Sequence, residues 1–223
     1  MALAFTFLLW IIKSAETLFG FSLHTLGVYP NQISGAIGIF TAPLIHGSYE
    51  HLANNSVALL LLITALHYGY PNTRYWVFFT IWFGSGLGVW LFARDAYHFG
   101  ASGLTHGMFF FLFISSILRR DKRSIVLMMI AFFMYGGMVH SVLPREPGIS
   151  FESHLFGAIA GFICALLLFK KDPKLEEPKY AWEQDGYQDD DDDIIGDEWK
   201  AEQPVQHTEL DHETAKTNNR TLH

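Results

Sequence analysis

A serine and a histidine with complementary chemistry lie near the starts of two long apolar segments of this chain. Ser102 stands in the stretch Gly100-Ala101-Ser102-Gly103, and His154 lies in a later segment. An imidazole that removes the proton of a serine hydroxyl turns the hydroxyl into a nucleophile, so the pair suggests covalent acyl-transfer chemistry. A serine in a membrane helix can instead bond a nearby carbonyl, so these two residues do not decide the matter alone.

Two further polar residues could stabilise an oxyanion. His51 and Asn55 are four residues apart, which places them on one face of a helix, and both side chains can donate hydrogen bonds. The amide of Ser102 would add a third donor, because the first N–H groups of a helix have no intrahelical partner. Three donors around a serine form an oxyanion hole. The alternative is that His51 and Asn55 form a polar clasp between helices.

Paired glycines supply a way to bring Ser102 and His154 together. Gly103 and Gly107 are four residues apart, and so are Gly157 and Gly161. Small residues at this spacing let two membrane helices approach closely, which would place the hydroxyl within reach of the imidazole. The glycines could also serve packing alone, with His154 bonded to a carbonyl. Glu152 precedes His154 by two positions, on the wrong side of a helix to orient its ring, so the pattern predicts a dyad with no carboxylate member, and Glu152 is expected in water or on loop amides.

Composition places these residues in a membrane protein. The chain has 223 residues, of which 50% are hydrophobic and only 17% charged. The single cysteine, Cys164, excludes an intramolecular disulfide and a thiolate metal cluster. The few Lys and Arg residues lie at segment ends, which does not suggest binding to nucleic acid.

Six apolar segments predict an all-α polytopic bundle. Each is near the length that a membrane-spanning helix requires, and they cover about residues 2–21, 51–68, 75–92, 102–118, 124–140 and 151–169. The stretch at about 27–43 is too interrupted to span and is expected to lie at the membrane interface. We therefore predict two parts: a six-helix membrane domain at 1–171 and an acidic tail at 172–223.

Charge predicts the orientation of the helices and the character of the tail. Loop Lys and Arg residues concentrate on one side of a six-helix arrangement, so the positive-inside rule predicts that both termini are cytoplasmic, in the cell (inner) membrane. His51, Ser102 and His154 then lie at one depth near the outer face. The tail contains the run Asp189 to Asp193 and has a low apolar content, which is typical of disorder.

The motifs resemble those of a known family. Gly100-Ala101-Ser102-Gly103 resembles the GxSG motif of the rhomboid intramembrane serine proteases. His46 to Asn55 is similar to the family's H-x4-H-x3-N, and His154 to Gly161 to its H-x2-G-x3-G. The three matches occur in family order, and the likeness covers about residues 27–169.

The resemblance implies a fold, an activity and a set of site residues. It implies a six-helix rhomboid-like bundle that cleaves transmembrane segments of other proteins in the lipid bilayer, near the outer face, without metal or cofactor. Ser102 would be the nucleophile, His154 the general base, and His51, Asn55 and the Ser102 amide the oxyanion hole. The remaining motif residues would support the site: His46, Gly100, Gly103, His106, Gly157 and Gly161.

Two departures from the family and two rival functions remain. The Trp-Arg pair often found before the first motif histidine is absent, and His106 stands where some members have the tyrosine that stacks on the catalytic histidine. One rival is a non-catalytic rhomboid-like protein that binds membrane clients. The other is a metal carrier that would use the histidines His46, His51, His106 and His154.

Overall fold

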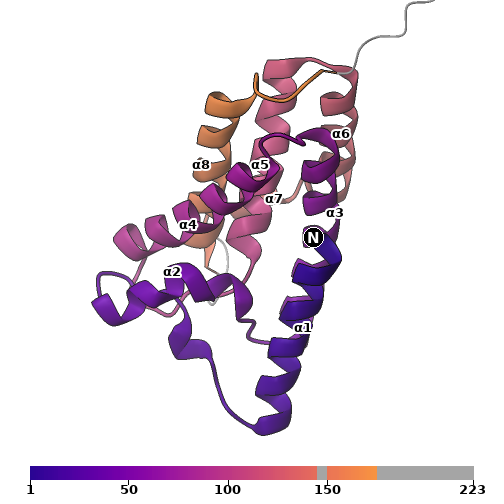
Figure 1. Cartoon of the computed structure of the whole chain (residues 1–223). Coiled ribbons are helices and arrows are strands. Elements are labelled where there is room, and N and C mark those ends of the chain that lie inside the picture. Colours follow the sequence, from indigo (N-terminus) through magenta and orange to yellow (C-terminus); the bar gives the residue numbers. More distant parts are fainter. Residues whose placement is uncertain (145–149, 175–223) are drawn as a thin grey trace, which may run out of the picture. The chain divides into compact units, whose positions relative to one another are not determined.

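The structure is a computed structural model that describes residues 1–144 and 150–174. Its described part is helical, and Figure 1 labels the principal helices. These are α1 (Ala2–Phe19), α2 (Gly38–Thr41), α3 (Tyr49–Gly69), α4 (Arg74–Phe92), α5 (Ser102–Arg119), α6 (Lys122–Tyr135), α7 (Met138–Ser141) and α8 (Phe151–Leu168). Short 3-10 turns lie at His24–Leu26, Ile33–Ile37 and Ala42–Leu44. Almost all of the predicted acidic tail lies outside the described residues.

Five helices are long and apolar enough to cross a membrane, namely α1, α3, α4, α5 and α8. This confirms the predicted all-α membrane class. The prediction of a continuous segment at about 124–140 is wrong: α6 has 14 residues, and α7 follows after Gly136 and Gly137. Two consecutive glycines weaken a helix because they lose the most backbone entropy on folding. Beyond the two glycines, the short helix α7 carries the chain on to Ser141.

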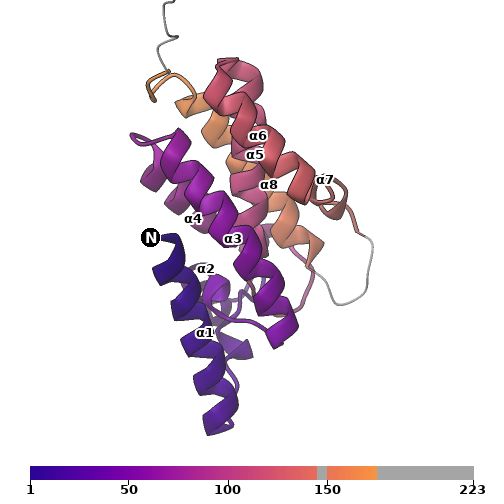
Figure 2. The ribbon, with the colours of Figure 1, turned by 90° about the vertical axis from the view of Figure 1, so that its right-hand side faces the viewer.

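The helix that begins at Ser102 lies at the centre of the bundle. In the spanning windows, 67% of α5 is buried, compared with 17% of α1. α5 packs against α3, α4, α6 and α8, and Figure 2 shows α5 and α8 side by side, as does Figure 1. A helix surrounded by other helices has a fixed position, so the residues at its start are held firmly.

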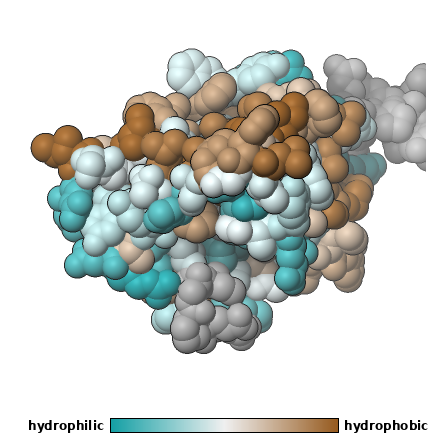
Figure 3. All heavy atoms as spheres, turned by 90° about the horizontal axis from the view of Figure 1, so that it is seen from below, coloured by the Kyte–Doolittle hydropathy of each residue, from teal (hydrophilic) through white to brown (hydrophobic). Residues whose placement is uncertain are grey.

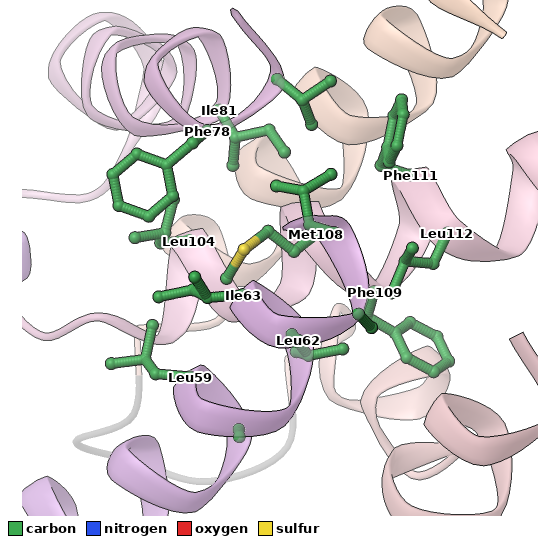
Figure 4. Close-up of a cluster of buried hydrophobic side chains, with 14 of the residues drawn as sticks. Leu59, Leu62, Ile63, Phe78, Ile81, Leu104, Met108, Phe109, Phe111 and Leu112 are labelled. Atoms are coloured by element: carbon green, nitrogen blue, oxygen red, sulfur yellow. The ribbon is translucent and has the colours of Figure 1, made fainter. Parts of the chain in front are cut away.

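Close packing of three helices fixes the interior. Figure 4 shows Met108 of α5 among side chains from α3 and α4, including Ile63 and Ile81. Met108 has no exposed surface, and neither do Ile63 and Ile81. Because lipid is as apolar as these side chains, tight contact between them, not escape from water, holds the helices together.

One end of the described unit is polar. Figure 3 looks from below onto the end where α1 finishes and α2 lies, and hydrophilic residues cover much of that face, with apolar residues along its margin. The short helical turns from Ile33 to Leu44 lie in this region, and the interfacial position expected of this stretch stays a prediction. The N-terminal ends of α3, α5 and α8 carry the candidate site residues.

A buried arginine closes the opposite end of the bundle. Arg119, the last residue of α5, is 3% exposed and donates from Nε to Asp121 Oδ2 at 2.8 Å. Its other nitrogens donate to the carbonyls of Phe169, Asp172 and Pro173 at 2.9–3.0 Å. The Asp172 carboxylate accepts from the amides of Asn72 and Thr73 at the start of α4. These bonds tie the end of α8 to α4, α5 and α6.

Candidate active site

Ser102 is the first residue of α5 and follows a glycine with an unusual conformation. Gly100 has φ +116°, which L side chains rarely adopt, and its amide donates to the Ala42 carbonyl at 2.9 Å. A Cβ on Gly100 would also lie 2.7 Å from His51 Cε1. Only glycine meets both requirements, so Gly100 lies against the His51 ring and the turn leads directly into Ser102 at the start of α5.

The glycine faces of α5 and α8 meet as the sequence predicts. A Cβ built on Gly157 would overlap the Gly103 carbonyl, and one on Gly161 would overlap the Gly107 carbonyl. The two backbones are therefore in direct contact along two turns. This contact brings the start of α8, which carries His154, beside the start of α5.

His154 is buried and its ring has a defined orientation. It is 8% exposed, and its Nδ1 lies 2.9 Å from the carbonyl of Ser141 in α7. Because a carbonyl only accepts, the Nδ1 atom carries the hydrogen, which leaves Nε2 of a neutral ring with a lone pair. That is the tautomer a general base requires.

One large cavity joins the candidate residues. It has a volume of about 950 Å³, and Ser102, His154, His51 and Asn55 all line it. No hydrogen bond to the Ser102 hydroxyl is found within the described residues, so Ser102 and His154 share the cavity without being bonded. Catalytic hydrogen bonds are often long before substrate binds.

Asn55 presents an unused donor in this cavity. Its side chain is 6% exposed, and Nδ2 has no hydrogen-bond partner among the described residues. A buried donor without a partner costs about 1–3 kcal/mol, so its presence suggests a role with a ligand. A polar clasp between helices would have used that amide.

His46 packs edge-on against His51, with ring centroids 5.1 Å apart. His46 lies in the loop before α3 and is 2% exposed, and neither of its nitrogens makes a well-formed hydrogen bond to the described residues, although the Leu44 backbone lies close. Burial, with a smaller contribution from His51, lowers the pKa of His46 to about 3. His46 is therefore a neutral ring in edge contact with His51.

His106 stacks on His154, as its position predicts. The two rings are almost parallel, with centroids 3.9 Å apart and planes 6° apart. His106 Nδ1 lies 2.7 Å from the Ser102 carbonyl, and Nε2 lies 2.7 Å from Ser141 Oγ. The imidazole thus makes polar contacts at both nitrogens while its face covers His154.

The expectation that Glu152 is wet or bonded to loop amides is wrong. Glu152 is 5% exposed, and its Oε1 lies 3.4 Å from Nε of Arg94 in the loop that leads to Ser102. Nearby, His98 Nε2 donates to the Arg94 carbonyl at 3.0 Å, and the Ser150 hydroxyl lies 2.7 Å from His98 Nδ1. Ser150 caps α8, so this loop is tied to the start of the helix that carries His154.

The sequence did not predict the contacts of Ser141 and His98. Ser141 contacts His106 and His154, and His98 contacts Ser150; these partners are 13 to 52 residues away in the chain, so no short motif reveals the contacts. The four histidines expected of a metal carrier lie in two ring pairs, but within the described ranges no three His, Cys, Asp or Glu residues are grouped so as to hold a metal ion.

Comparison with known proteins shows similarity over most of the chain. A family model described as "Rhomboid domain" matches residues 34–171. An uncharacterised protein of Mycobacterium tuberculosis is 31% identical over 194 residues, which is 83% of this chain and 81% of that protein. An uncharacterised Mycobacterium leprae protein is 30% identical over 188 residues, 80% of this chain and 74% of the other.

A Bacillus subtilis protein named "Putative rhomboid protease YdcA" is 24% identical over 185 residues, which is 74% of this chain and 88% of that protein. No solved structure gives a significant match. The match to the family model covers more than half of the chain, and it includes the three helix starts that line the cavity. Together with the five apolar helices, it identifies the protein as an integral membrane protein that belongs to the rhomboid family.

Proposed function

We propose that the protein is an intramembrane serine endopeptidase with a Ser102–His154 dyad. The observation that carries the proposal is that the Ser102 hydroxyl, the His154 ring and the unpartnered Asn55 amide all belong to one cavity at the N-terminal ends of three helices. Packing alone does not require that combination. Membership of a family that includes intramembrane serine proteases supports it.

The first step is attack on a peptide carbonyl. His154 Nε2 takes the proton of the Ser102 hydroxyl as Oγ adds to the scissile carbonyl. The ring keeps its hydrogen at Nδ1, where the Ser141 carbonyl stabilises the imidazolium that forms. The dyad thus uses a backbone oxygen in the place where other serine proteases use a carboxylate.

Three hydrogen-bond donors would stabilise the negative charge that develops on the oxygen of the scissile carbonyl. The Asn55 amide has a free N–H, and the Ser102 amide is one of the first N–H groups of α5. The His51 ring lines the same cavity, held at its edge by His46. The intermediate then collapses: His154 gives its proton to the leaving amine, and water hydrolyses the acyl-serine in a second round of the same chemistry.

The lining of the cavity fits a transmembrane substrate. Part of it is formed by Val57 and Ala58 of α3, Tyr135 of α6 and Met138 of α7. An apolar wall suits a segment that arrives from the lipid.

We further propose that the substrates are transmembrane segments of other membrane proteins, cut near the outer face of the cell membrane. In this orientation both termini of the enzyme are cytoplasmic.

Cleavage of a single-pass membrane protein tests the function. Purified protein in vesicles should cut the substrate and should react with a fluorophosphonate probe at Ser102. Ser102→Ala and His154→Ala should each abolish cleavage, and Ser102→Ala should abolish labelling. Cleavage retained by either variant contradicts the dyad. A wild-type protein that retains the substrate without cutting it or reacting with the probe would instead be a client-binding member of the family.

A further inference from the structure

Ser141 contacts both stacked imidazoles, although it lies 35 residues after His106 and 13 before His154. Its carbonyl accepts from His154 Nδ1 at 2.9 Å, and its hydroxyl lies 2.7 Å from His106 Nε2. Ser141 ends α7, the short helix after the two glycines, and is half-buried. One residue therefore holds two rings that belong to different helices.

The hydrogen positions follow from the acceptors. The Ser102 carbonyl only accepts, so His106 Nδ1 must donate to it across 2.7 Å. In a neutral ring, His106 Nε2 then accepts, and the Ser141 hydroxyl donates to it. The hydroxyl has a competing acceptor in its own helix, the Met138 carbonyl at 3.1 Å. The longer distance to Met138 favours the bond to His106.

These contacts form a closed chain around the dyad. It runs from the Ser102 carbonyl through His106 to the Ser141 hydroxyl, and from the Ser141 carbonyl to His154. The parallel stack of the two rings closes it. Rotation of either ring would break a hydrogen bond and the stack together. Among the described residues, the atom bonded to His154 Nδ1 is the Ser141 carbonyl oxygen, and Glu152 is directed to Arg94.

We propose that Ser141 is a positioning residue of the active site, which orients His154 directly and through His106. This inference rests on the proposed protease function. Ser141 does not act on the substrate; it holds the His154 ring so that Nε2 faces the cavity with its lone pair. Its hydroxyl fixes His106, and His106 in turn keeps the His154 ring from tilting.

The test removes the hydroxyl and leaves the carbonyl. Ser141→Ala should lower kcat and the rate of fluorophosphonate labelling about tenfold, the factor that corresponds to one hydrogen bond of about 1.4 kcal/mol. KM should change less than about twofold, because Ser141 makes no substrate contact. Ser141→Thr keeps the hydroxyl and should restore the labelling rate.

A matched control separates positioning from folding. Ser116 is a buried serine at the far end of α5, and its hydroxyl donates to the Phe113 carbonyl three residues earlier at 2.9 Å. Ser116→Ala removes the same atoms, and it should leave the labelling rate unchanged. Thermal unfolding of each variant in detergent shows whether the fold survives.

A second variant keeps the inference testable if Ser141→Ala is unstable. His106→Phe keeps an aromatic face on His154 and removes both polar contacts, so it should slow labelling at least tenfold. The double variant should be no slower than His106→Phe alone, because the Ser141 hydroxyl acts through His106. Additive losses, or a folded Ser141→Ala that labels at the wild-type rate, would overturn the inference while the protease function stands. An unreactive but folded wild-type protein would overturn both.

Discussion

Gly157 of α8 lies directly against the backbone carbonyl of Gly103 in α5. Ser102 immediately precedes Gly103, and His154 lies three residues before Gly157, one turn of helix away. The contact between these two glycines therefore sets the distance between the proposed nucleophile and the proposed base. A change at this contact should affect both stability and activity.

Gly157→Ala should separate the two helices. The added methyl group would overlap the Gly103 carbonyl, which is backbone and cannot turn away, so we expect a loss of about 1–3 kcal/mol in the free energy of unfolding. Cleavage should fall more steeply, because the dyad is displaced. Gly137→Ala is the matched control: nothing lies within 4 Å of its Cβ, so unfolding in detergent should be unchanged or slightly harder. Equal stability of Gly157→Ala and wild type would disprove the close contact.

Asn55→Ala should lower turnover more than it affects substrate binding. Loss of one oxyanion-hole donor costs about 10²–10³-fold in kcat, with KM little changed, because the amide acts on charge that appears only in the transition state. Asn55→Asp places a negative charge near the oxyanion and should be at least as inactive. Asn54→Ala removes a more exposed amide that lines the same cavity, and it should lose less than about tenfold. A normal kcat in Asn55→Ala would remove Asn55 from the mechanism.

Acid should destabilise the protein in part through His46. Its pKa falls from 6.5 to about 3 on folding, chiefly because of burial. Between these values the unfolded chain binds a proton that the folded chain does not, so this contribution to stability is complete above about pH 6.5 and is lost as the pH falls. Unfolding measured between pH 7.5 and 5 should show a shallower pH dependence for His46→Phe than for wild type. His140→Phe, at an exposed histidine, should behave as wild type.

Arg119→Ala should weaken the end of the bundle far from the cavity. Arg119 is 3% exposed and holds Asp121 together with the carbonyls that follow α8. Removing one member of a buried ion pair typically costs about 3–5 kcal/mol. Arg120 is exposed, so Arg120→Ala should change the free energy of unfolding by less than about 0.5 kcal/mol. Comparable stability in the two variants would contradict the buried network.

The depressed pKa of Asp121 belongs to the same network. Burial alone would raise the pKa of this carboxyl, but hydrogen bonds from Ser124 and Arg119 outweigh burial and hold the pKa below its ordinary value. The ionised form therefore contributes stability above the ordinary pKa of an aspartate, and the contribution is lost only as the pH falls through the lower, folded value. At neutral pH the Asp121 carboxylate is therefore ionised, and it accepts the hydrogen bond from Arg119 Nε.

Much of the architecture could be predicted from the amino-acid sequence. A membrane-spanning helix satisfies its backbone hydrogen bonds within one segment, so length and apolar content are enough to locate it. The glycine pairs also predicted a close contact, because only a missing side chain allows two backbones to touch. The prediction of one continuous helix at about 124–140 was wrong, because the apolar sequence continues past Gly136 and Gly137 whereas α6 ends at Tyr135.

The pairing of side chains across helices was decided by the tertiary structure. Local spacing in the sequence does not reveal four features of the structure: the bond from His154 to the Ser141 carbonyl, the link from His98 to Ser150, the Arg94–Glu152 pair and the burial of Arg119. The partners in these contacts are not separated by a helical period, so only the packed positions of the helices determine which donor meets which acceptor. The sequence by itself determined the five long apolar helices, the family resemblance and the candidate dyad, because these depend on local composition and short motifs. What orients His154 depends on a backbone oxygen of another helix, and a backbone oxygen has no residue type to reveal it.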